Sequence, residues 1–158
     1  MSKYYLAYGS NLNTKQMKFR CPTAIAVGTA VLKDYQLLFK GSKTGSYLTI
    51  EKAKGCEVPV AVWKVEDSDE QALDRYEGYP TFYYKQEMEI DFISLIKREV
   101  RHRKAFVYIM HEDRKIGIPT QYYLGVCLEG YLRFGFDSRI LDKALRNSYQ
   151  EAMKNGKR

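Results

Sequence analysis

The chain has 158 residues, 45% of them hydrophobic and 28% charged, and its 26 Lys and Arg against 19 Asp and Glu give a formal charge of +7. This composition is typical of a globular protein and excludes an intrinsically disordered one, and a chain of about 150 residues buries roughly 68–70% of its unfolded surface without a metal or disulfide staple. Three cysteines, Cys21, Cys56 and Cys127, lie in separate segments without a CxxC pair, which argues against structural zinc and favours a reducing compartment.

The N-terminal 65 residues predict strands around one short helix. Lys3 to Tyr8 alternates in polarity and ends at Gly9, which indicates a strand that runs into a tight loop. A short helix over residues 14–20 should end before Pro22. The strands expected after it cover residues 24–32, 35–40, 46–51 and 57–65. A turn at residues 33–34 would separate the first two of these.

Helices frame two further strands in the rest of the chain. A helix over residues 69–76 has Ser68 and Gln71 as its capping box and stops at Gly78. The next strand, residues 82–92, alternates so that one face, which we expect to point inward, carries Phe82, Tyr84, Met88, Ile90 and Phe92. The remaining elements are a central strand over residues 105–111, helices over residues 120–134 and about 138–153, and a frayed tail over residues 154–158.

These elements predict a single domain of residues 1–158 in the α+β class, built on a strongly curved mixed sheet or a small β-barrel with flanking helices. No stretch approaches the roughly 20 apolar residues that cross a bilayer, and the apolar run before Gly9 is too short for the core of a signal peptide. The sequence therefore predicts a soluble, cytoplasmic protein with no membrane partner.

The charge is unevenly distributed, with +6 over residues 1–50, −5 over residues 51–100 and +6 over residues 101–158. The densest basic run, residues 97–104, lies between two predicted strands. Such a run can bind phosphates, and the 14 tyrosines could stack on bases, so a basic nucleic-acid-binding protein is one alternative. A solvated turn is the simpler interpretation of the run, and we predict no nucleic-acid partner.

Most enzyme templates are missing from the sequence. Its two histidines, His102 and His111, have no spacing to each other or to a cysteine that suggests a metal site. The GxSxG, GxGxxG and GxxxxGK[ST] patterns are also absent. We therefore predict neither a metal nor a cofactor, and expect any chemistry to use carboxylates, tyrosines and backbone amides.

The first candidate site is the loop Tyr8-Gly9-Ser10-Asn11-Leu12, where the first strand meets a short helix. Consecutive amide N–H groups at such a junction can point into one concavity and bind a carboxylate or a developing oxyanion. The alternative interpretation is an ordinary turn and helix cap.

The second candidate is Glu77, at the end of the helix that stops at Gly78. The negative end of the helix dipole opposes ionisation of this carboxyl, and burial would do the same, so its pKa should be raised. A glutamate with a raised pKa suits general acid/base work near neutral pH. The alternative is a solvated surface glutamate.

In combination, the YGSNL loop, the helix ending in Glu-Gly, a tyrosine seven residues further on and the later Pro-Thr-Gln-Tyr-Tyr-Leu resemble the γ-glutamylcyclotransferase family over roughly residues 3–132. The resemblance implies that the loop from Tyr8 to Leu12 cradles a γ-glutamyl group and that Glu77 is the catalytic acid/base. It also implies two pocket tyrosines, Tyr84 and Tyr123. The second is chosen over Tyr122 because it falls four residues after Pro119, although core packing explains either tyrosine equally well.

The reaction that the resemblance implies is an intramolecular aminolysis without a cofactor. The α-amine of a small-molecule γ-glutamyl substrate attacks its own side-chain carbonyl, which closes 5-oxoproline and releases the attached amino acid or amine. A relative acting on another γ-glutamylated small molecule and a non-catalytic binding member of the fold are the alternatives. Family members occur as monomers and as homodimers.

Overall fold

The computed structural model describes residues 2–42 and 45–156 of the chain. The strands are β1 (Lys3–Ala7), β2 (Ile25–Ser42), β3 (Gly45–Val65), β4 (Tyr83–Ser94), β5 (Val100–Met110) and β6 (Lys115–Ile116). The helices are the 3-10 helix η1 (Ser10–Leu12) and the α-helices α1 (Thr14–Arg20), α2 (Asp67–Glu77), α3 (Gln121–Phe134) and α4 (Ser138–Gly156).

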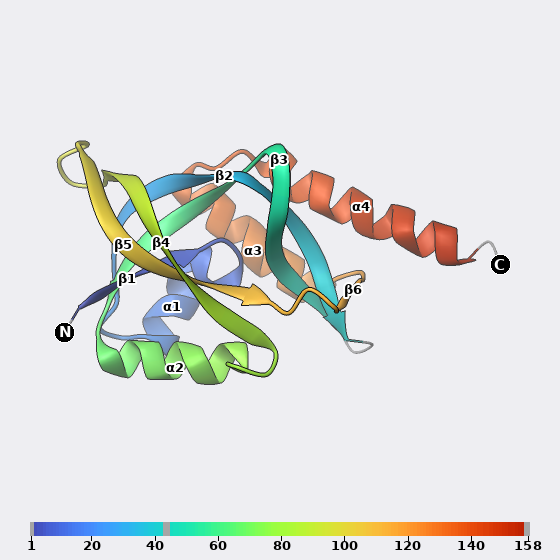
Figure 1. The fold of residues 1–158 in the computed structure, drawn as a ribbon, viewed down its shortest axis with the longest axis horizontal. Helices are drawn as coiled ribbons and strands as arrows, with labels where there is room; N and C mark the ends of the chain where they lie inside the picture. The colour runs from blue at the N-terminus through green and yellow to red at the C-terminus, as the bar shows by residue number, and fades with distance from the viewer. Residues whose placement is uncertain (1, 43–44, 157–158) are drawn as a thin grey trace.

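Five strands form a closed barrel in the order β3-β1-β5-β4-β2, with β2 pairing back to β3 and the short β6 added beyond β2 (Figure 1). Strand β1 lies between β3, to which it is antiparallel, and β5, to which it is parallel through the pair Tyr5 and Phe106. Closure leaves the barrel without open edges along these strands. The predicted α+β class with a small barrel is thus confirmed.

The predicted turn at residues 33–34 is wrong, because β2 continues through it. The pairing with β3 shifts register between Lys33 and Tyr35, and Asp34 adopts a φ of 65°. The Asp34 carboxylate accepts a hydrogen bond from the Gly55 amide of β3 at 3.0 Å. The polar residues 33–34, which predict a turn in the sequence, therefore form a β-bulge within a continuous strand. The strands predicted over residues 24–32 and 35–40 are one strand, β2, and those predicted over residues 46–51 and 57–65 are one strand, β3.

Helix α2 begins earlier than the sequence suggests. Its N-cap is Glu66, and the Asp69 carboxylate accepts a hydrogen bond from the Glu66 amide at 3.0 Å. Ser68 therefore lies inside the first turn and is not the cap. The predicted end is confirmed, because Gly78 adopts a φ of 62°, a left-handed conformation that favours glycine and ends the helix directly after Glu77.

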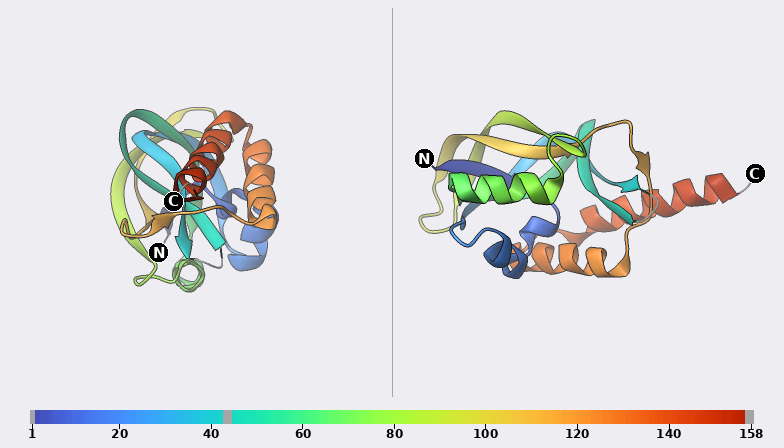
Figure 2. Two further views of the ribbon diagram at one scale, coloured as in Figure 1. Left: turned by 90° about the vertical axis from the view of Figure 1, so that its right-hand side faces the viewer. Right: turned by 90° about the horizontal axis from the view of Figure 1, so that it is seen from below.

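The helices lie on different sides of the barrel (Figure 2). Helix α2 crosses one side, and α3 packs against η1 on another. Helix α4 contacts β2 through a face that includes the buried Leu141 and Ala144, and then extends away from the barrel. It continues to Gly156, beyond the predicted end at residue 153, and residues 157–158 of the predicted tail lie outside the described residues. No helix among the described residues is both long and apolar enough to span a membrane.

Candidate active site

A cavity of about 350 Å³ lies between the barrel wall, the end of α2 and the loop that follows β1. Its buried residues, which we call the floor, are Tyr5, Tyr8, Gly9, Ser10, Asn11, Leu48, Tyr83 and Tyr108. Its more exposed residues, which we call the rim, are Tyr47, Arg75, Tyr76 and Gly78. This volume lies at the low end of the range for small-molecule sites, roughly 300–1,000 Å³.

The predicted loop forms one side of the cavity. Residues Tyr8 to Asn11 line it, and η1 is closed by hydrogen bonds from the Leu12 amide to the Gly9 carbonyl and from the Asn13 amide to the Ser10 carbonyl, both at 3.0 Å. The first amides of a helix have no partner within the helix, so those of Ser10 and Asn11 remain for other acceptors. The loop therefore presents backbone donors beside the cavity.

Leu12 does not line the cavity but anchors the loop from behind. Its side chain is completely buried, and it meets α3 at Gly130, where an added Cβ would come within 2.5 Å of the Leu12 Cβ. Only glycine allows this close approach. The contact between Leu12 and Gly130 therefore fixes the position of the loop relative to α3.

Glu77 is the only acidic residue among the described residues that line the cavity. Burial raises the pKa of its carboxyl to about 8, although the positive charge of Arg20 acts in the opposite direction. Burial also raises the pKa values of six neighbouring tyrosine hydroxyls, and the charge of Glu77 adds to each shift; these are Tyr5, Tyr8, Tyr76, Tyr83, Tyr108 and Tyr123. Glu77 is thus a carboxyl with a near-neutral pKa among phenol groups.

Arg20, at the end of α1, connects the loop to the end of α2. Its guanidinium donates a hydrogen bond to the Asn11 Oδ1 and stacks over the Tyr76 ring, with the Cζ atom 3.4 Å from the ring centroid. Tyr76 in turn shares a hydrogen bond with the Ser10 hydroxyl at 2.8 Å. Because Arg20 fixes Oδ1 as the acceptor, the Asn11 Nδ2 donates to the Tyr5 hydroxyl at 2.9 Å.

The two predicted pocket tyrosines behave differently. Tyr123 lines the cavity, with its hydroxyl accepting a hydrogen bond from the Leu48 amide at 3.0 Å, whereas Tyr122 is 76% exposed. Tyr84 is not among the lining residues; its hydroxyl donates to the Glu112 carboxylate at 2.5 Å. The adjacent Tyr83 lines the cavity instead and donates to the Leu48 carbonyl at 2.8 Å.

The expectation that Tyr84 faces the pocket is corrected because β4 has two partly buried faces. Ile90 and Phe92 are buried on the face that includes Tyr84, whereas Tyr83 shares its face with Lys85, which forms ion pairs to α2. The cavity lies on the α2 side. The alternation of the sequence separates the two faces of β4, but it does not indicate on which face the cavity lies.

The sequence does not predict the contributions of Tyr5, Tyr108 and Arg20 to the site. Tyr5 and Tyr108 lie on strands that were recognised, but a buried tyrosine in a strand is typical of any core. The Tyr108 hydroxyl donates to the Asp74 carboxylate at 2.6 Å. Arg20 offered the clearest signal, because an arginine at a helix end just before Pro22 suits the helix dipole, but its partners are distant in sequence.

Within residues 2–42 and 45–156, no group of three or more His, Cys, Asp or Glu side chains is placed to hold a metal ion. The polar groups around the cavity are the Glu77 carboxyl, several phenols, the Ser10 hydroxyl, the Asn11 amide, the Arg75 guanidinium and backbone N–H donors. These groups can move protons and bind polar substrates. The barrel and its cavity therefore define a small-molecule site equipped for acid/base chemistry.

Comparison with known proteins assigns the chain to a family. Residues 5–125 match the family described as "Gamma-glutamyl cyclotransferase, AIG2-like". Proteins named gamma-glutamylcyclotransferase from Bos taurus and Homo sapiens are each 39% identical over 131 residues, which cover 78% of this chain and 68% of the relative. The Mus musculus protein of that name is 28% identical over 157 residues, covering 95% of this chain and 76% of the relative.

Solved structures agree with this assignment. One named "Gamma-glutamyl cyclotransferase" has a TM-score of 0.75 and 27% identity, and the match covers 91% of this chain and 86% of the other. The structure of an uncharacterized human protein has a TM-score of 0.74 and 28% identity, over 90% and 86% of the two chains. The chain therefore belongs to the γ-glutamyl cyclotransferase, AIG2-like family and is an enzyme of this type.

Proposed function

We propose that the enzyme converts a γ-glutamyl amino acid or γ-glutamyl amine into 5-oxoproline and the free amino acid or amine. The substrate's α-amine nitrogen bonds to its own γ-carbonyl carbon, and the bond from that carbon to the leaving nitrogen breaks. One proton leaves the amine and one reaches the leaving nitrogen. The reaction therefore needs a group that accepts a proton and then returns one, and neither an oxidant nor water is consumed.

The observation that carries this proposal is that Glu77 lines the cavity and is more exposed than the floor residues but less exposed than those of the rim. The floor, which includes the Tyr8 to Asn11 loop, would hold the γ-glutamyl group, and the rim would hold the leaving group. The bond that breaks joins these two parts of the substrate. The carboxyl thus lies beside the place where both protons move.

The pKa of Glu77 suits this proton transfer. A free α-amine has a pKa of roughly 7.7–8.0, so an unperturbed glutamate near 4.3 would be a poor base for it. With a pKa of about 8, Glu77 matches the amine, and the proton moves between them at little cost in free energy. The same carboxyl, once protonated, is a strong enough acid to protonate the leaving nitrogen.

The loop supplies the other requirement of the reaction. Attack of the amine creates a negatively charged tetrahedral oxygen, and the backbone donors of Ser10 and Asn11 beside the cavity are suited to bind it or the substrate carboxylate. Since the nucleophile and the carbonyl belong to one molecule, a small enclosed cavity also contributes by folding the substrate into a reactive conformation.

A binding-only role fits the site less well. Burying a carboxyl so that its pKa rises to about 8 makes its ionised form costly at neutral pH. A binding protein gains nothing from that cost, whereas a proton-transfer catalyst requires it. The described cavity therefore favours catalysis over passive binding of a γ-glutamyl compound.

The proposed function is tested by a substrate screen. The purified enzyme is incubated with γ-glutamyl amino acids, γ-glutamyl amines and glutathione, and 5-oxoproline is detected by mass spectrometry. We expect 5-oxoproline from at least one of the first two groups, in equal amount to the released amino acid or amine. Release of glutamate in place of 5-oxoproline would show hydrolysis and contradict the proposal.

A further inference from the structure

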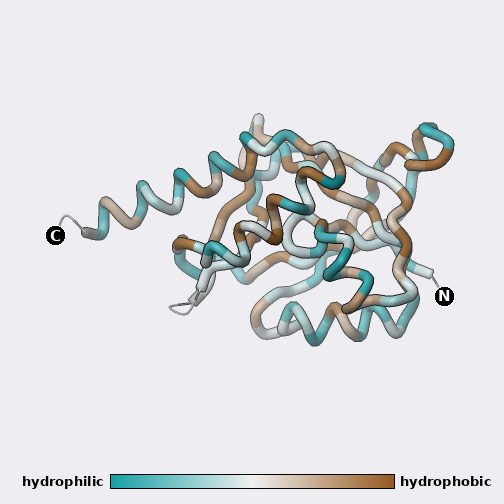
Figure 3. Tube along the Cα trace, turned by 180° about the vertical axis from the view of Figure 1, so that it is seen from behind, coloured by the Kyte–Doolittle hydropathy of each residue, from teal (hydrophilic) through white to brown (hydrophobic). Residues whose placement is uncertain are grey.

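The tip of the β4–β5 hairpin exposes aliphatic side chains that the active site does not use. Ile96 is 88% exposed and Val100 is 70% exposed, and Ile93 and Leu95 beside them are about half exposed. Figure 3 shows hydrophobic colouring on this hairpin, which projects from the barrel. We call these four residues the aliphatic tip. Neighbouring aliphatic side chains at such exposure mark an interaction surface.

A cationic hollow of about 210 Å³ adjoins the aliphatic tip and shares Ile96 with it. Its basic lining residues are Lys64, Lys97, Arg101 and Arg103, and no acidic residue lines it among the residues that the structure describes. Glu99 nearby forms one ion pair, to Arg101 at 2.7 Å. The basic run predicted as a solvated turn is thus partly a strand that contributes to a cation cluster.

The other acidic residues of the hairpin lie on its opposite face. Asp91 is the register partner of His102 and contacts it at 2.6 Å, whereas Phe92 is the partner of Arg101. Since successive strand residues point to opposite faces, Asp91 points away from the face of Arg101, and so do Ile93 and its register partner Val100. The hollow therefore keeps a net positive charge.

The tip is already held in one conformation. The Ser94 hydroxyl accepts hydrogen bonds from the amides of Ile96 and Lys97 at 3.3 and 3.4 Å, and the Leu95 amide donates to the Val27 carbonyl of β2 at 3.0 Å. Docking of this tip would therefore cost little ordering entropy.

We infer that the aliphatic tip and the cationic hollow dock the enzyme onto the surface of an anionic phospholipid membrane. The tip enters end-on, so that the aliphatic side chains of both hairpin faces reach the interface between headgroups and acyl chains, and the four basic residues of the hollow bind the headgroup phosphates. Such binding needs no membrane-spanning helix, and it replaces the sequence-based expectation of no membrane partner.

Other occupants fit the surface less well. Single-stranded nucleic acid binds by stacking on exposed aromatic rings, but the tip is aliphatic and Phe92 in the hollow is buried. Tyr4, the other aromatic residue of the hollow, is only partly exposed, and its ring packs against Phe92 and lies under the Arg103 guanidinium. A second copy of the chain would bring two clusters of the same charge together, which is unfavourable. A lipid surface satisfies both the apolar and the cationic groups.

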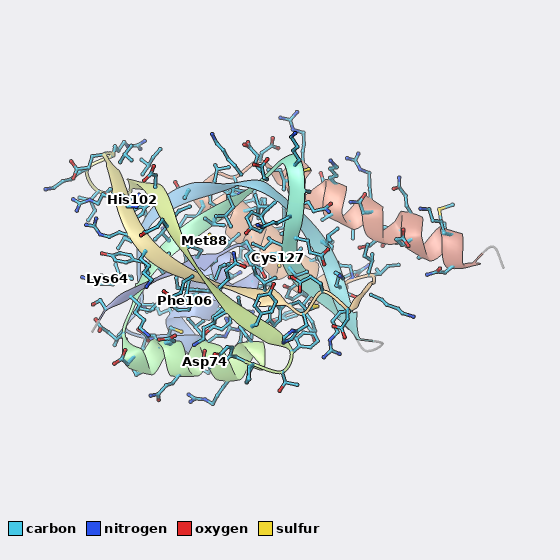
Figure 4. All side chains as sticks on the ribbon, in the orientation of Figure 1. Lys64, Asp74, Met88, His102, Phe106 and Cys127 are labelled. Carbon is cyan, nitrogen blue, oxygen red and sulfur yellow. The ribbon has the colours of Figure 1, made fainter. Side chains whose placement is uncertain are left out.

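The docking surface is far from the cavity. Strand β4 begins at Tyr83 in the floor and ends at Ser94 beside the tip, which corresponds to roughly 35 Å of strand at about 3.3 Å per residue. In Figure 4, the labelled His102 and Lys64 lie at this end of the barrel, away from α4. Substitutions at the tip should therefore leave activity on γ-glutamyl substrates unchanged.

Sedimentation with vesicles tests the inference. The full chain is mixed with phosphatidylcholine vesicles that either contain or lack phosphatidylglycerol, and bound protein is measured after centrifugation. We expect binding only with the anionic lipid and its loss at about 1 M salt, where the screening length falls to about 3 Å. The double variant Lys64→Gln, Lys97→Gln should bind about 25-fold more weakly, since each cation near an anionic surface contributes about fivefold.

Two further variants separate the apolar contribution from net charge. Ile96→Ser combined with Val100→Ser keeps every charge and should lower vesicle binding at least tenfold. Lys143→Gln combined with Arg146→Gln removes two exposed cations from α4 and should have little effect. The inference would be overturned if the protein did not bind vesicles or if both charge variants weakened binding equally. It would also be overturned if the protein preferred single-stranded nucleic acid or soluble glycerol phosphate to the vesicles.

Discussion

The raised pKa of Glu77 predicts a specific dependence of stability on pH. In the folded enzyme this carboxyl holds its proton up to about pH 8, whereas in the unfolded chain it releases it near 4.5. Between these values the folded state binds more protons than the unfolded state. The free energy of unfolding therefore falls as pH rises from about 4.5 to about 8, and this contribution is constant below and above that window.

The size of this contribution follows from the two pKa values. Each pH unit between them corresponds to about 1.4 kcal/mol, so ionising Glu77 in the fold costs up to about 5 kcal/mol. The value is an upper bound because the carboxyl borders a cavity that admits water. Glu77→Gln removes the titrating group and keeps its shape, so the variant should gain stability relative to the wild type as pH rises.

Urea unfolding of both proteins at several pH values between 4.5 and 8.5 measures this difference. All other titrating groups are shared, so the difference in unfolding free energy isolates Glu77 to a good approximation. We expect it to grow by several kcal/mol in favour of the variant. A difference that stays constant across this range would refute a raised pKa and the burial on which it rests.

Three further predictions follow from the same contacts. Arg20→Gln should move the acid limb of the kcat/KM profile to higher pH, because the arginine charge lowers the Glu77 pKa, whereas Lys18→Gln on the same helix should not; an unmoved limb would contradict the coupling. Tyr83→Phe should lower kcat/KM about fivefold through loss of its hydrogen bond to Leu48, whereas Tyr84→Phe should not, and the reverse order would show that the cavity is on the other face of β4. Gly130→Ala should lower the free energy of unfolding by about 1–3 kcal/mol in denaturant titration, because its Cβ would meet Leu12 at 2.5 Å, whereas Gly125→Ala, with no atom within 4 Å, should not; equal effects would disprove the packing argument.

Local chemistry made much of the fold predictable. Alternation located the strands, and Gly78 marked the end of α2, which determines where Glu77 lies. Prediction was wrong where long-range pairing overrode a local signal. Asp34 reads as a turn residue, but its side chain bonds to Gly55 across the β2–β3 hairpin and stabilises a bulge in a continuous strand.

The candidate site was predictable in outline but not in its environment. Motif and helix-end reasoning selected Glu77 and the loop, because both signals are local in sequence. The site also includes Arg20, Tyr5 and Tyr108, which contribute through contacts between residues that are distant in the chain. Such contacts cannot be predicted from the periodicity of the sequence. Tyr84 was preferred to Tyr83 because alternation identifies two faces of a strand without identifying the one that borders a cavity.

The proposed mechanism requires Glu77 to be the group that transfers the protons. The most direct test measures 5-oxoproline formation from a γ-glutamyl amino acid by the wild type and by Glu77→Gln, with 5-oxoproline binding as the control for an intact cavity. We predict that kcat falls by about 10²–10⁴, the typical contribution of a general acid/base, while binding persists. Undiminished turnover in the variant would contradict the central claim.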